Sequence, residues 1–334
     1  MKNEDYKIAV IGHGSWATAL VKILTDNSCV VRWYVRNQEV LEHIDKNGNN
    51  PKYLSQVHFA KTSLSLYDDI NEAVAQADVV ILATPSAFLK GVLSALSVPL
   101  SDKFVISAIK GIVPDEWLTV AEYVNHTFGL PFANIGVITG PCHAEEVALE
   151  RLSYLTMVCK DTEQAERLGQ YFVAPYIRVN TSNDIYGVEW AAVLKNIYAI
   201  AGGMCHSMGY GDNFFAVLVS NAGIEIERFL RQTYPFDRDI MASAYVGDLL
   251  VTCYSQFSRN RTFGQMIGKG YSVKSAQMEM NMVAEGYYAT ACLHEVKERG
   301  GYKIDMPIAD AMYSILYEKR AVKSTINSIL DKLI

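Results

Sequence analysis

The sequence predicts an α/β protein in which an N-terminal Rossmann-type, doubly wound sheet is followed by an all-α C-terminal domain. Three observations support this prediction. Through the first half of the chain, short β-branched or apolar runs alternate with helix-like stretches, as in βαβ units. A glycine-rich turn follows the first of these runs. Beyond Val179 the apolar residues recur with helical spacing and the strand-like runs cease.

The length of 334 residues predicts about two domains. Because Asn180-Thr-Ser-Asn-Asp is a cluster of turn formers, we expect one domain over residues 1–185 and another over 186–334. The predicted strands are 7–11, 29–35, 79–83, 104–108, 135–138, 155–158 and 177–179. The predicted helices of the second domain are 187–205, 212–234, 242–256, 262–268, 272–279, 286–299 and 307–318.

Composition excludes several classes of protein. With 36 acidic and 30 basic residues the net charge is −6, and no block of Lys or Arg suits a nucleic acid. No apolar run reaches the roughly 20 residues of a membrane span, and the acidic N-terminus does not resemble a signal peptide. The six scattered cysteines predict free thiols and a cytoplasmic protein, and the seven histidines lack metal-ligand spacing, so we expect no metal.

The first strand leads into a dinucleotide-binding turn. Gly12 allows the tight turn, Gly14 lets the backbone approach a pyrophosphate, and Ala17 is small enough for helix–strand packing. The helix that follows offers its unpaired N–H groups to the phosphates. Arg36, after the next strand, could face a ribose 2′-phosphate, which favours NADP or tolerance of both NAD and NADP. Alternatively, Arg36 is a solvated residue at a strand end.

Polar residues also follow later strands, at the edge of the sheet where open α/β folds bind ligands. Lys110 could orient a substrate hydroxyl or phosphate. Pro141 suits the first position of a helix, so residues 140–144 are expected to form an anion-binding helix N-terminus. Each of these features could also be ordinary turn chemistry.

The segment from Gly187 to Gly203 predicts a helix that is buried on all sides, yet it contains Lys195 and Asn196. A buried lysine costs several kcal/mol unless it is paired or functional, and burial lowers its pKa toward neutrality. Lys195 is therefore a candidate proton donor and acceptor. The alternatives are a structural ion pair or a side chain that reaches the surface.

Two further groups of polar residues occur in the helical half. Asp248 and Thr252 lie four residues apart and share a helical face. The donor-rich segment Ser258-Arg259-Asn260-Arg261 suits a phosphate or carboxylate, or else it is a solvated loop. Glu285 could be an exposed helix start or a hydrogen-bond partner of a cofactor.

Six motifs occur in order along essentially the whole chain: Gly-His-Gly-Ser-Trp-Ala-Thr-Ala, Ala-Ile-Lys110-Gly-Ile, Thr-Gly140-Pro, Gly-Val-Glu-x5-Lys195-Asn, Gly-Asp248-Leu and Ser258-Arg-Asn-Arg-x-Phe-Gly. Together they resemble bacterial glycerol-3-phosphate dehydrogenase (NAD(P)+). The resemblance implies reversible reduction of dihydroxyacetone phosphate to sn-glycerol 3-phosphate, the backbone of phospholipids. It also implies an NAD(P)-binding domain before a substrate-binding, catalytic one.

The resemblance assigns roles residue by residue. Lys195 matches the proton donor and acceptor, and the other catalytic positions are Lys110, Asp248 and Thr252. The substrate positions are Lys110, Gly140, Cys142, Lys195, Asp248, Ser258, Arg259 and Asn260. The cofactor positions are Gly12, Gly14, Ser15, Trp16, Arg36, Lys110, Ala144, Arg259, Val283 and Glu285. Cys142 replaces the family's Ser, so only the backbone N–H contact carries over there, because a thiol is a weak donor.

Two other functions compete with this one. A β-hydroxyacid-type NADP-dependent dehydrogenase shares the Rossmann and helical halves but has a Lys-x-x-x-Asn spacing, whereas Asn196 follows Lys195 directly. A non-catalytic NADPH-sensing protein would bind the cofactor without turnover. The expected partner is a small-molecule substrate, and the apolar helical domain could form a homodimer.

Overall fold

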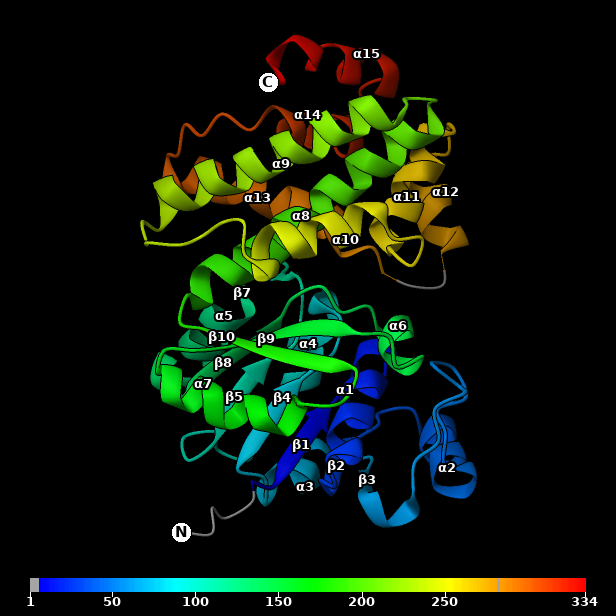
Figure 1. Cartoon of the computed structure of the whole chain (residues 1–334), viewed down its shortest axis with the longest axis vertical. Coiled ribbons are helices and arrows are strands. Elements are labelled where there is room, and N and C mark those ends of the chain that lie inside the picture. The colour runs from blue at the N-terminus through cyan, green and yellow to red at the C-terminus, as the bar shows by residue number, and fades with distance from the viewer. Residues whose placement is uncertain (1–5, 281–282) are drawn as a thin grey trace. The chain divides into compact units, whose positions relative to one another are not determined.

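The structure, a computed structural model, describes residues 6–280 and 283–334. It forms two compact units, of which the first runs to Ile109 and resumes over Val120–Ile185. The second comprises Lys110–Thr119 and Tyr186–Ile334. Figure 1 shows a sheet with helices in the first unit and helices in the second.

The first unit contains one eight-stranded sheet, in the order β10-β9-β8-β5-β4-β1-β2-β3. Its strands are β1 (Ile8–Ile11), β2 (Val31–Tyr34), β3 (Leu64–Tyr67), β4 (Val79–Leu82), β5 (Phe104–Ser107), β8 (Ile135–Thr139), β9 (Ser153–Cys159) and β10 (Ile177–Ser182). The strands β1 and β4 are apolar and buried along their whole length, which is typical of a parallel sheet covered on both faces. The predicted Rossmann-type class is confirmed.

Two features of this sheet differ from the prediction. The edge strand β3 was not among the predicted strands, because its residues are only half-buried and alternate weakly. All neighbouring strands are parallel except β8 and β9, which pair antiparallel. The sequence predicted a parallel sheet, but a short buried strand has the same apolar pattern in either direction.

Helices connect the strands of the first unit. They are α1 (Ser15–Asp26), α2 (Gln38–Asn47), α3 (Ile70–Ala75), α4 (Ser86–Leu93), α5 (Val120–Phe128), α6 (Ala144–Ala148) and α7 (Thr162–Gly169). The helix α2 shows why these boundaries fall where they do. Asn37 accepts a hydrogen bond from Val40 N at its start, and Gly48 ends it with a left-handed φ of 75°.

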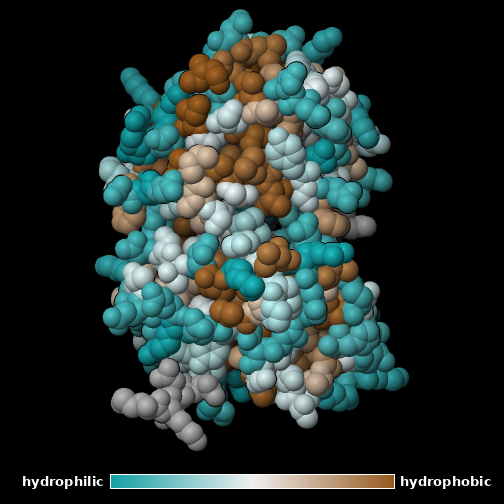
Figure 2. All heavy atoms as spheres, in the orientation of Figure 1, coloured by the Kyte–Doolittle hydropathy of each residue, from teal (hydrophilic) through white to brown (hydrophobic). Residues whose placement is uncertain are grey.

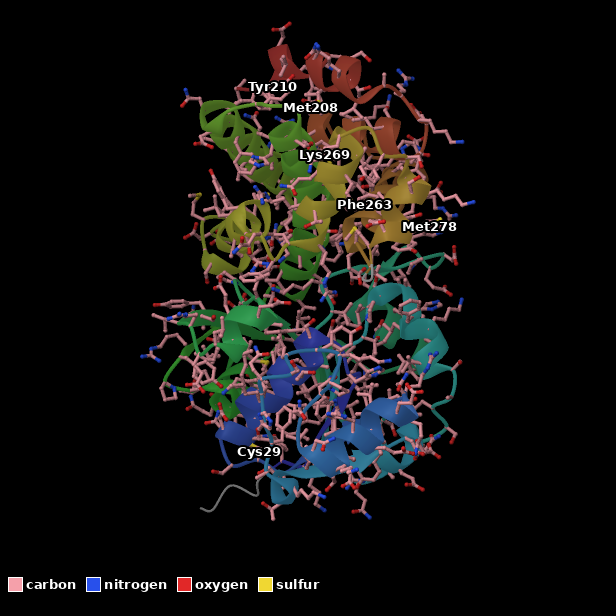
Figure 3. The ribbon with its side chains drawn as sticks, turned by 90° about the vertical axis from the view of Figure 1, so that its right-hand side faces the viewer. Cys29, Met208, Tyr210, Phe263, Lys269 and Met278 are labelled. Carbon is pink, nitrogen blue, oxygen red and sulfur yellow. The ribbon has the colours of Figure 1, made fainter. Side chains whose placement is uncertain are left out.

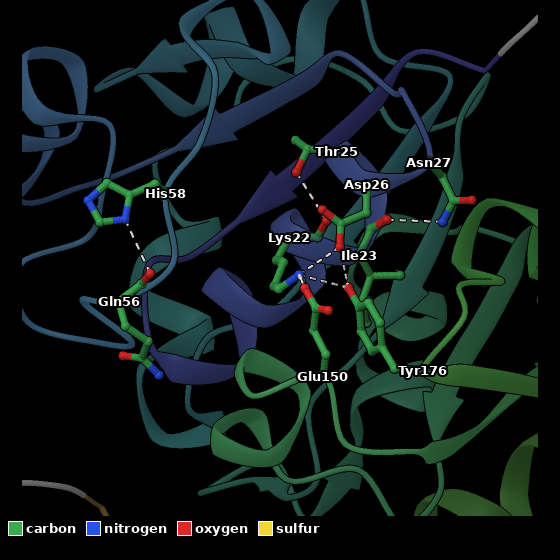
Figure 4. Close-up of polar contacts among 9 residues, drawn as sticks. All are labelled: Lys22, Ile23, Thr25, Asp26, Asn27, Gln56, His58, Glu150 and Tyr176. Carbon is green, nitrogen blue, oxygen red and sulfur yellow. Dashed lines mark hydrogen bonds and ion pairs between the residues drawn. The ribbon is translucent and has the colours of Figure 1, made fainter.

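A polar cluster fixes the C-terminal part of α1 (Figure 4). Lys22 Nζ lies 2.7 Å from Asp26 and 2.9 Å from Glu150, and it donates to the Tyr176 hydroxyl at 3.2 Å. The Tyr176 hydroxyl in turn donates to Asp26. Burial alone would lower the pKa of Lys22, but its hydrogen bonds to the two carboxylates and the hydroxyl raise it overall. The cluster ties α1 to segments more than a hundred residues away.

The second unit is helical apart from one short hairpin. Its helices are α8 (Ile185–Ser207), α9 (Asp212–Thr233), α10 (Asp248–Tyr254), α11 (Arg259–Gly268), α12 (Val273–Glu279), α13 (Glu285–Gly300), α14 (Pro307–Leu316) and α15 (Val322–Asn327). The predicted all-α character is confirmed. Three details differ from the prediction. The helix α15 was not predicted, and α11 begins at Arg259 instead of residue 262. The predicted helix 242–256 is divided into a π-helical turn over Ser243–Gly247 and the helix α10 that follows it.

The helices α8 and α11 cross with their backbones in contact. A Cβ atom on Gly264 would lie 2.0 Å from Ile200 O, and one on Gly203 would lie 2.0 Å from Arg261 O. Both positions therefore require glycine. Phe263, next to this crossing, is fully buried (Figure 3). The Phe-Gly pair of the last motif is thus a packing requirement for the two helices.

The segment Lys110–Thr119 belongs to the second unit, although it interrupts the first unit in sequence. It contains the hairpin strands β6 (Ile112–Val113) and β7 (Leu118–Thr119), which were not predicted because each has two residues. Asp115 and Trp117 both have left-handed φ angles, of 67° and 60°. The Trp117 ring lies 5.0 Å from the guanidinium of Arg299 on α13, a cation–π contact that secures the hairpin.

A buried glutamate fixes the start of α14. Glu225 accepts hydrogen bonds from Ile308 N at 2.7 Å, Ala309 N at 3.2 Å and the Tyr198 hydroxyl at 3.0 Å. A carboxylate at a helix N-terminus interacts favourably with the helix dipole. Burial nevertheless raises the pKa of Glu225 to about 7.

Candidate active site

The turn between β1 and α1 has the backbone shape of a phosphate-binding loop. Gly12 has a φ of +127°, and a Cβ there would lie 2.4 Å from Ala83 O, so only glycine fits. A Cβ on Gly14, in contrast, would meet nothing within 4 Å. Gly14 precedes α1, and no side chain caps the helix at this position. The helix N-terminus therefore has room for an anion beside its backbone, as a dinucleotide pyrophosphate requires.

The predicted cofactor residues of the first unit lie around this turn. Ser15 and Trp16 form the first turn of α1, and Arg36 is exposed just after β2. Burial lowers the pKa of His13, and the charges of Lys52 and Arg36 lower it further, so the imidazole is neutral at pH 7. Arg36 and Lys52 both place positive charge beside the turn.

Two buried threonine hydroxyls occur where strands of the same sheet end. Thr139 is the last residue of β8, and Thr84 follows β4 by two residues. Neither Oγ1 has a hydrogen-bond partner among the residues that the structure describes. Since a buried hydroxyl is normally satisfied, these atoms fit a ligand that supplies polar groups at this edge.

The backbone around Gly140 differs from the prediction. The helix α6 begins at Ala144, with His143 as its N-cap, so Pro141 is not at the first helical position and the helix starts three residues later than predicted. Gly140 instead has a φ of +109°, with an ideal Cβ 2.7 Å from Tyr154 O, so it forms a turn against β9. The Cys142 thiol donates to the same Tyr154 O at 3.0 Å. A turn at Gly140 therefore precedes the helix, and the helix N-terminus lies at His143 and Ala144, at the end of the predicted range.

In the second unit, three charged side chains meet in a buried position. Lys195 Nζ lies 2.5 Å from one carboxylate oxygen of Asp248, and Lys110 Nζ lies 3.2 Å from the other. Lys195 and Asp248 are only 4% and 1% exposed, whereas the Lys110 side chain is 21% exposed. Lys195 comes from the centre of α8, Asp248 from the first turn of α10, and Lys110 precedes the hairpin.

The electrostatics of this trio favour proton transfer by Lys195. Burial lowers its pKa to about 7, and nearby Lys110 lowers it as well, although Asp248 opposes both effects. For Asp248, burial alone would raise the pKa, but the two lysines hold it below its ordinary value. Asp248 therefore stays ionised while Lys195 can change protonation state near neutral pH.

Two asparagines hold the backbone around the trio. Asn196 Nδ2 donates to Lys110 O at 2.6 Å and to Ala192 O at 3.0 Å. Asn260 Nδ2 donates to Asn196 Oδ1 at 2.8 Å, and Asn260 Oδ1 accepts from Gly286 N at 2.9 Å. This amide pair links α8, α11 and α13. The sequence singled out Asn196 only by its place in a buried helix and did not indicate that it positions Lys110.

The other predicted site residues of this unit lie on the same helices. Thr252 Oγ1 donates to Asp248 O at 2.6 Å, one turn earlier on α10. Ser258 caps α11 by accepting from Arg261 N at 3.3 Å, and Arg259 is its first, half-buried residue. Glu285 is the first residue of α13, and Val283 precedes it by two. No three His, Cys, Asp or Glu side chains are grouped as metal ligands within residues 6–280 and 283–334.

A glycine-rich phosphate turn on a Rossmann sheet and a buried lysine of near-neutral pKa in a helical unit together define a class: the nicotinamide-dependent dehydrogenases with a helical second domain. The model of the NAD-dependent glycerol-3-phosphate dehydrogenase N-terminus matches residues 7–165, and the C-terminal model matches residues 184–327. The chain belongs to the NAD-dependent glycerol-3-phosphate dehydrogenase family.

Individual relatives agree with the family models. A glycerol-3-phosphate dehydrogenase (NAD(P)+) of Staphylococcus haemolyticus is 34% identical over 328 residues, which cover 98% of both chains. One from Staphylococcus aureus is 34% identical over 331 residues, again with 98% coverage of both. The crystal structure of the glycerol-3-phosphate dehydrogenase of Coxiella burnetii superposes with a TM-score of 0.89 at 26% identity, covering 98% of this chain and 99% of that one.

The chain is accordingly an NAD(P)-dependent oxidoreductase that reduces dihydroxyacetone phosphate to sn-glycerol 3-phosphate, with NAD or NADP as its cofactor. The resemblance found from six sequence motifs is confirmed. Within the described ranges, none of the helices is both long enough and apolar enough to cross a membrane.

Proposed function

We propose that Lys195 transfers the proton in this reaction. During reduction its ammonium group donates a proton to the ketone oxygen as that oxygen gains negative charge. During oxidation the neutral amine accepts the proton of the substrate hydroxyl. The observation that carries this proposal is a lysine that is 4% exposed, lies 2.5 Å from Asp248 and has a pKa of about 7.

When bound, the reduced nicotinamide supplies the hydride. The resemblance assigns residues of each unit to the cofactor. The turn formed by Gly12 and Gly14 would hold the pyrophosphate, and Arg36 would contact the adenosine ribose and accept NADP as well as NAD. The remaining proposed cofactor residues are Ser15, Trp16, Lys110, Ala144, Arg259, Val283 and Glu285.

For the substrate, we assign the two ends of the molecule to different residues. Lys110 and Asp248, joined by their ion pair, would orient the reacting carbonyl together with Thr252. The phosphate would bind Ser258, Arg259 and Asn260, where an arginine can contact two oxygens at once. By resemblance, Gly140 and Cys142 would lie beside the substrate, although the Cys142 N–H already donates to Gly140 O at 2.9 Å. Binding the phosphate in this way uses contacts remote from the reacting carbon to position the carbonyl.

The assay that tests the proposal follows loss of reduced-nicotinamide absorbance when dihydroxyacetone phosphate is added to the purified protein. NADPH and NADH are run in parallel, with wild type and Lys195→Met. We expect rapid oxidation by wild type with both cofactors, faster with NADPH, and almost none by the variant. A variant with wild-type turnover would disprove the role of Lys195, and cofactor binding without any wild-type turnover would instead favour a sensor.

We also propose that the helical unit mediates a homodimer. Several apolar side chains on α9, α10 and the flanking segments are exposed, and Figure 2 shows hydrophobic residues gathered on this unit. The exposed apolar side chains on α9, α10 and their flanking segments include Val217, Met241, Leu250, Tyr254 and Phe257. Sedimentation of wild type and Leu250→Glu tests this surface: we expect a dimer for the wild type and a monomer for the variant.

The biological setting is proposed on similar grounds. All six cysteines are free thiols, which fits a reducing cytoplasm. We propose that residues 1–185 and 186–334 act as the cofactor and substrate domains, and that the product supplies phospholipid synthesis with its glycerol backbone. Depleting the enzyme from its host should arrest growth, and added glycerol 3-phosphate should restore it.

A further inference from the structure

All three carbonyl groups of the turn Gly12-His13-Gly14 are bound by buried side chains of the first unit. Trp33 Nε1 donates to Gly12 O at 2.6 Å, Asn50 Nδ2 donates to His13 O at 2.9 Å, and Thr18 Oγ1 donates to Gly14 O at 3.0 Å. Trp33, Asn50 and Thr18 are each 0% exposed. Buried donors of the first unit therefore hold the carbonyl oxygens of all three residues of the turn.

The direction of these carbonyls matters for an anion. A peptide group that rotated its oxygen outward would present negative partial charge to a pyrophosphate and turn its N–H away from it. Glycine makes such rotations easy, because it adopts both left- and right-handed conformations. The turn thus needs external restraints, and the three donors supply them.

Among the three donors, Asn50 makes the most contacts and comes from the loop beyond α2. Its Nδ2 donates to His13 O and to Thr18 Oγ1, both at 2.9 Å, and its Oδ1 accepts from Lys52 N at 3.0 Å and Tyr53 N at 3.2 Å. An asparagine has two donor hydrogens and two acceptor lone pairs, so these four bonds use all of them. Asn50 consequently has no capacity left to bind a ligand directly.

We propose that Asn50 is a positioning residue for the cofactor: it fixes the His13 carbonyl and the Thr18 hydroxyl, and so keeps the phosphate turn ready for a dinucleotide. The Asn50–Thr18–Gly14 chain of hydrogen bonds carries this effect to the start of α1. The proposal rests on the proposed role of this turn in cofactor binding. No part of it depends on Lys195 or on the substrate.

The test measures NADPH dissociation constants by protein fluorescence, without turnover, for the full chain and for Asn50→Ala. Losing one orienting hydrogen bond is worth about a factor of ten in affinity. We therefore expect the NADPH Kd to rise about tenfold, while kcat at saturating NADPH and the KM for dihydroxyacetone phosphate change less than about twofold. A Kd within twofold of wild type would overturn the proposal.

A matched control separates positioning from general loss of stability. Lys103 is also buried and donates to the backbone, at 3.0 Å to Ala77 O, but it lies just before β5 at the amino ends of the strands. Lys103→Met should lower the melting temperature without changing the NADPH Kd. If it raised the Kd as much as Asn50→Ala at equal loss of stability, the positioning role would be refuted.

A second variant keeps the test informative should Asn50→Ala fail to fold. Thr18→Val removes the hydroxyl that connects Asn50 to Gly14 O and keeps the side-chain shape. By itself it should raise the NADPH Kd severalfold. Where Asn50→Ala does fold, the double variant should raise the Kd by less than the product of the two single effects, because both act through one network. Independent, multiplicative effects would contradict that network. Since binding is measured directly, failure of the reaction assay leaves this result interpretable.

Discussion

Lys195 Nζ lies 2.5 Å from Asp248 Oδ1, and both side chains are almost excluded from water. Two buried charges at this distance stabilise each other, yet each also loses its hydration. Burial lowers the pKa of Lys195 more than Asp248 raises it, and the second lysine, Lys110, which shares the carboxylate, lowers it further. With a pKa of about 7, Lys195 is about half ionised at neutral pH, which suits the proton transfer proposed for it.

Replacing Lys195 with Met should remove proton transfer while leaving cofactor binding intact. General acid–base catalysis contributes about 10²–10⁴ in rate, so we expect kcat to fall by that factor. The apolar stem of Met still fills the space on α8. Steady-state kinetics and an NADPH titration check the two halves of this prediction, and a parallel loss of NADPH affinity would indicate damage to the fold.

The pH dependence should differ between the two directions. With the pKa of Lys195 lowered to about 7, the ammonium donor is lost as pH rises above that value. The kcat for reduction should therefore fall about tenfold per pH unit on the alkaline side, whereas the kcat for oxidation should rise toward pH 7 and then level off. Initial rates from pH 5.5 to 9 test this prediction. Identical pH profiles for reduction and oxidation would argue against Lys195 as the group that transfers the proton.

Asp248→Asn should shift the same profile toward acid. The Asp248 carboxylate raises the pKa of Lys195, so its removal lowers that pKa further and moves the alkaline limb of reduction to lower pH. It also leaves buried lysines unpaired, which costs about 3–5 kcal/mol of stability. Asp310→Asn is the control, because its pair with Lys297 at 2.7 Å is at the surface and is worth at most about 1 kcal/mol.

Arg259→Ala should weaken binding of the phosphorylated substrate. A charge-assisted contact to phosphate contributes about 1.5–3 kcal/mol, so the KM for dihydroxyacetone phosphate should rise about 10- to 100-fold. Turnover of unphosphorylated dihydroxyacetone should change much less. Lys269→Ala removes an exposed charge just past the other end of α11 and should affect neither substrate. Equal losses on both substrates would place Arg259 away from the phosphate.

The buried Glu225 should make the protein less stable as pH rises from about 4.5 to 7. Its pKa is raised to about 7 in the folded state, so the folded chain binds more protons than the unfolded chain in this window. The free energy of unfolding therefore falls with pH there, by on the order of 3 kcal/mol in total. Urea unfolding at pH 5 and pH 8 measures this, and Glu225→Gln should flatten the difference. An equal pH difference in the variant would assign the effect to other groups.

The sequence predicted those elements whose pattern is long or extreme. The buried helix around Lys195 was evident because nearly every side is apolar, and the turn at Gly12 was evident because the strand, turn and helix occur together. Elements that depend on distant partners were missed. The edge strand β3 and the two-residue strands β6 and β7 are defined by pairing, which leaves little trace in so few residues.

In the candidate active site, too, residues with a local sequence signal were predicted and residues defined by distant partners were missed. Lys110, Lys195 and Asp248 were predicted together through the resemblance, and the structure places them in one cluster. Asn50 was missed, since Asn49-Asn50-Pro51 indicates only a turn and gives no sign of a partner at His13. The helix expected to start at Pro141 begins three residues later, at Ala144, after Gly140 has formed a turn against β9. Local signals identify side chains with chemistry, but tertiary contacts decide which of them hold the others in place.

The assignment of Lys110–Thr119 to the second unit has a consequence for how the protein is made. During synthesis this hairpin emerges from the ribosome long before its partners, because Asn196, which binds Lys110 O, follows 86 residues later. At about 5–20 residues per second that interval lasts about 4–17 s, and Arg299 on α13 appears later still. During this interval Lys110–Thr119 lacks these partners in the second unit, so a protease or chaperone that acts cotranslationally can reach Lys110 before the enzyme encloses it.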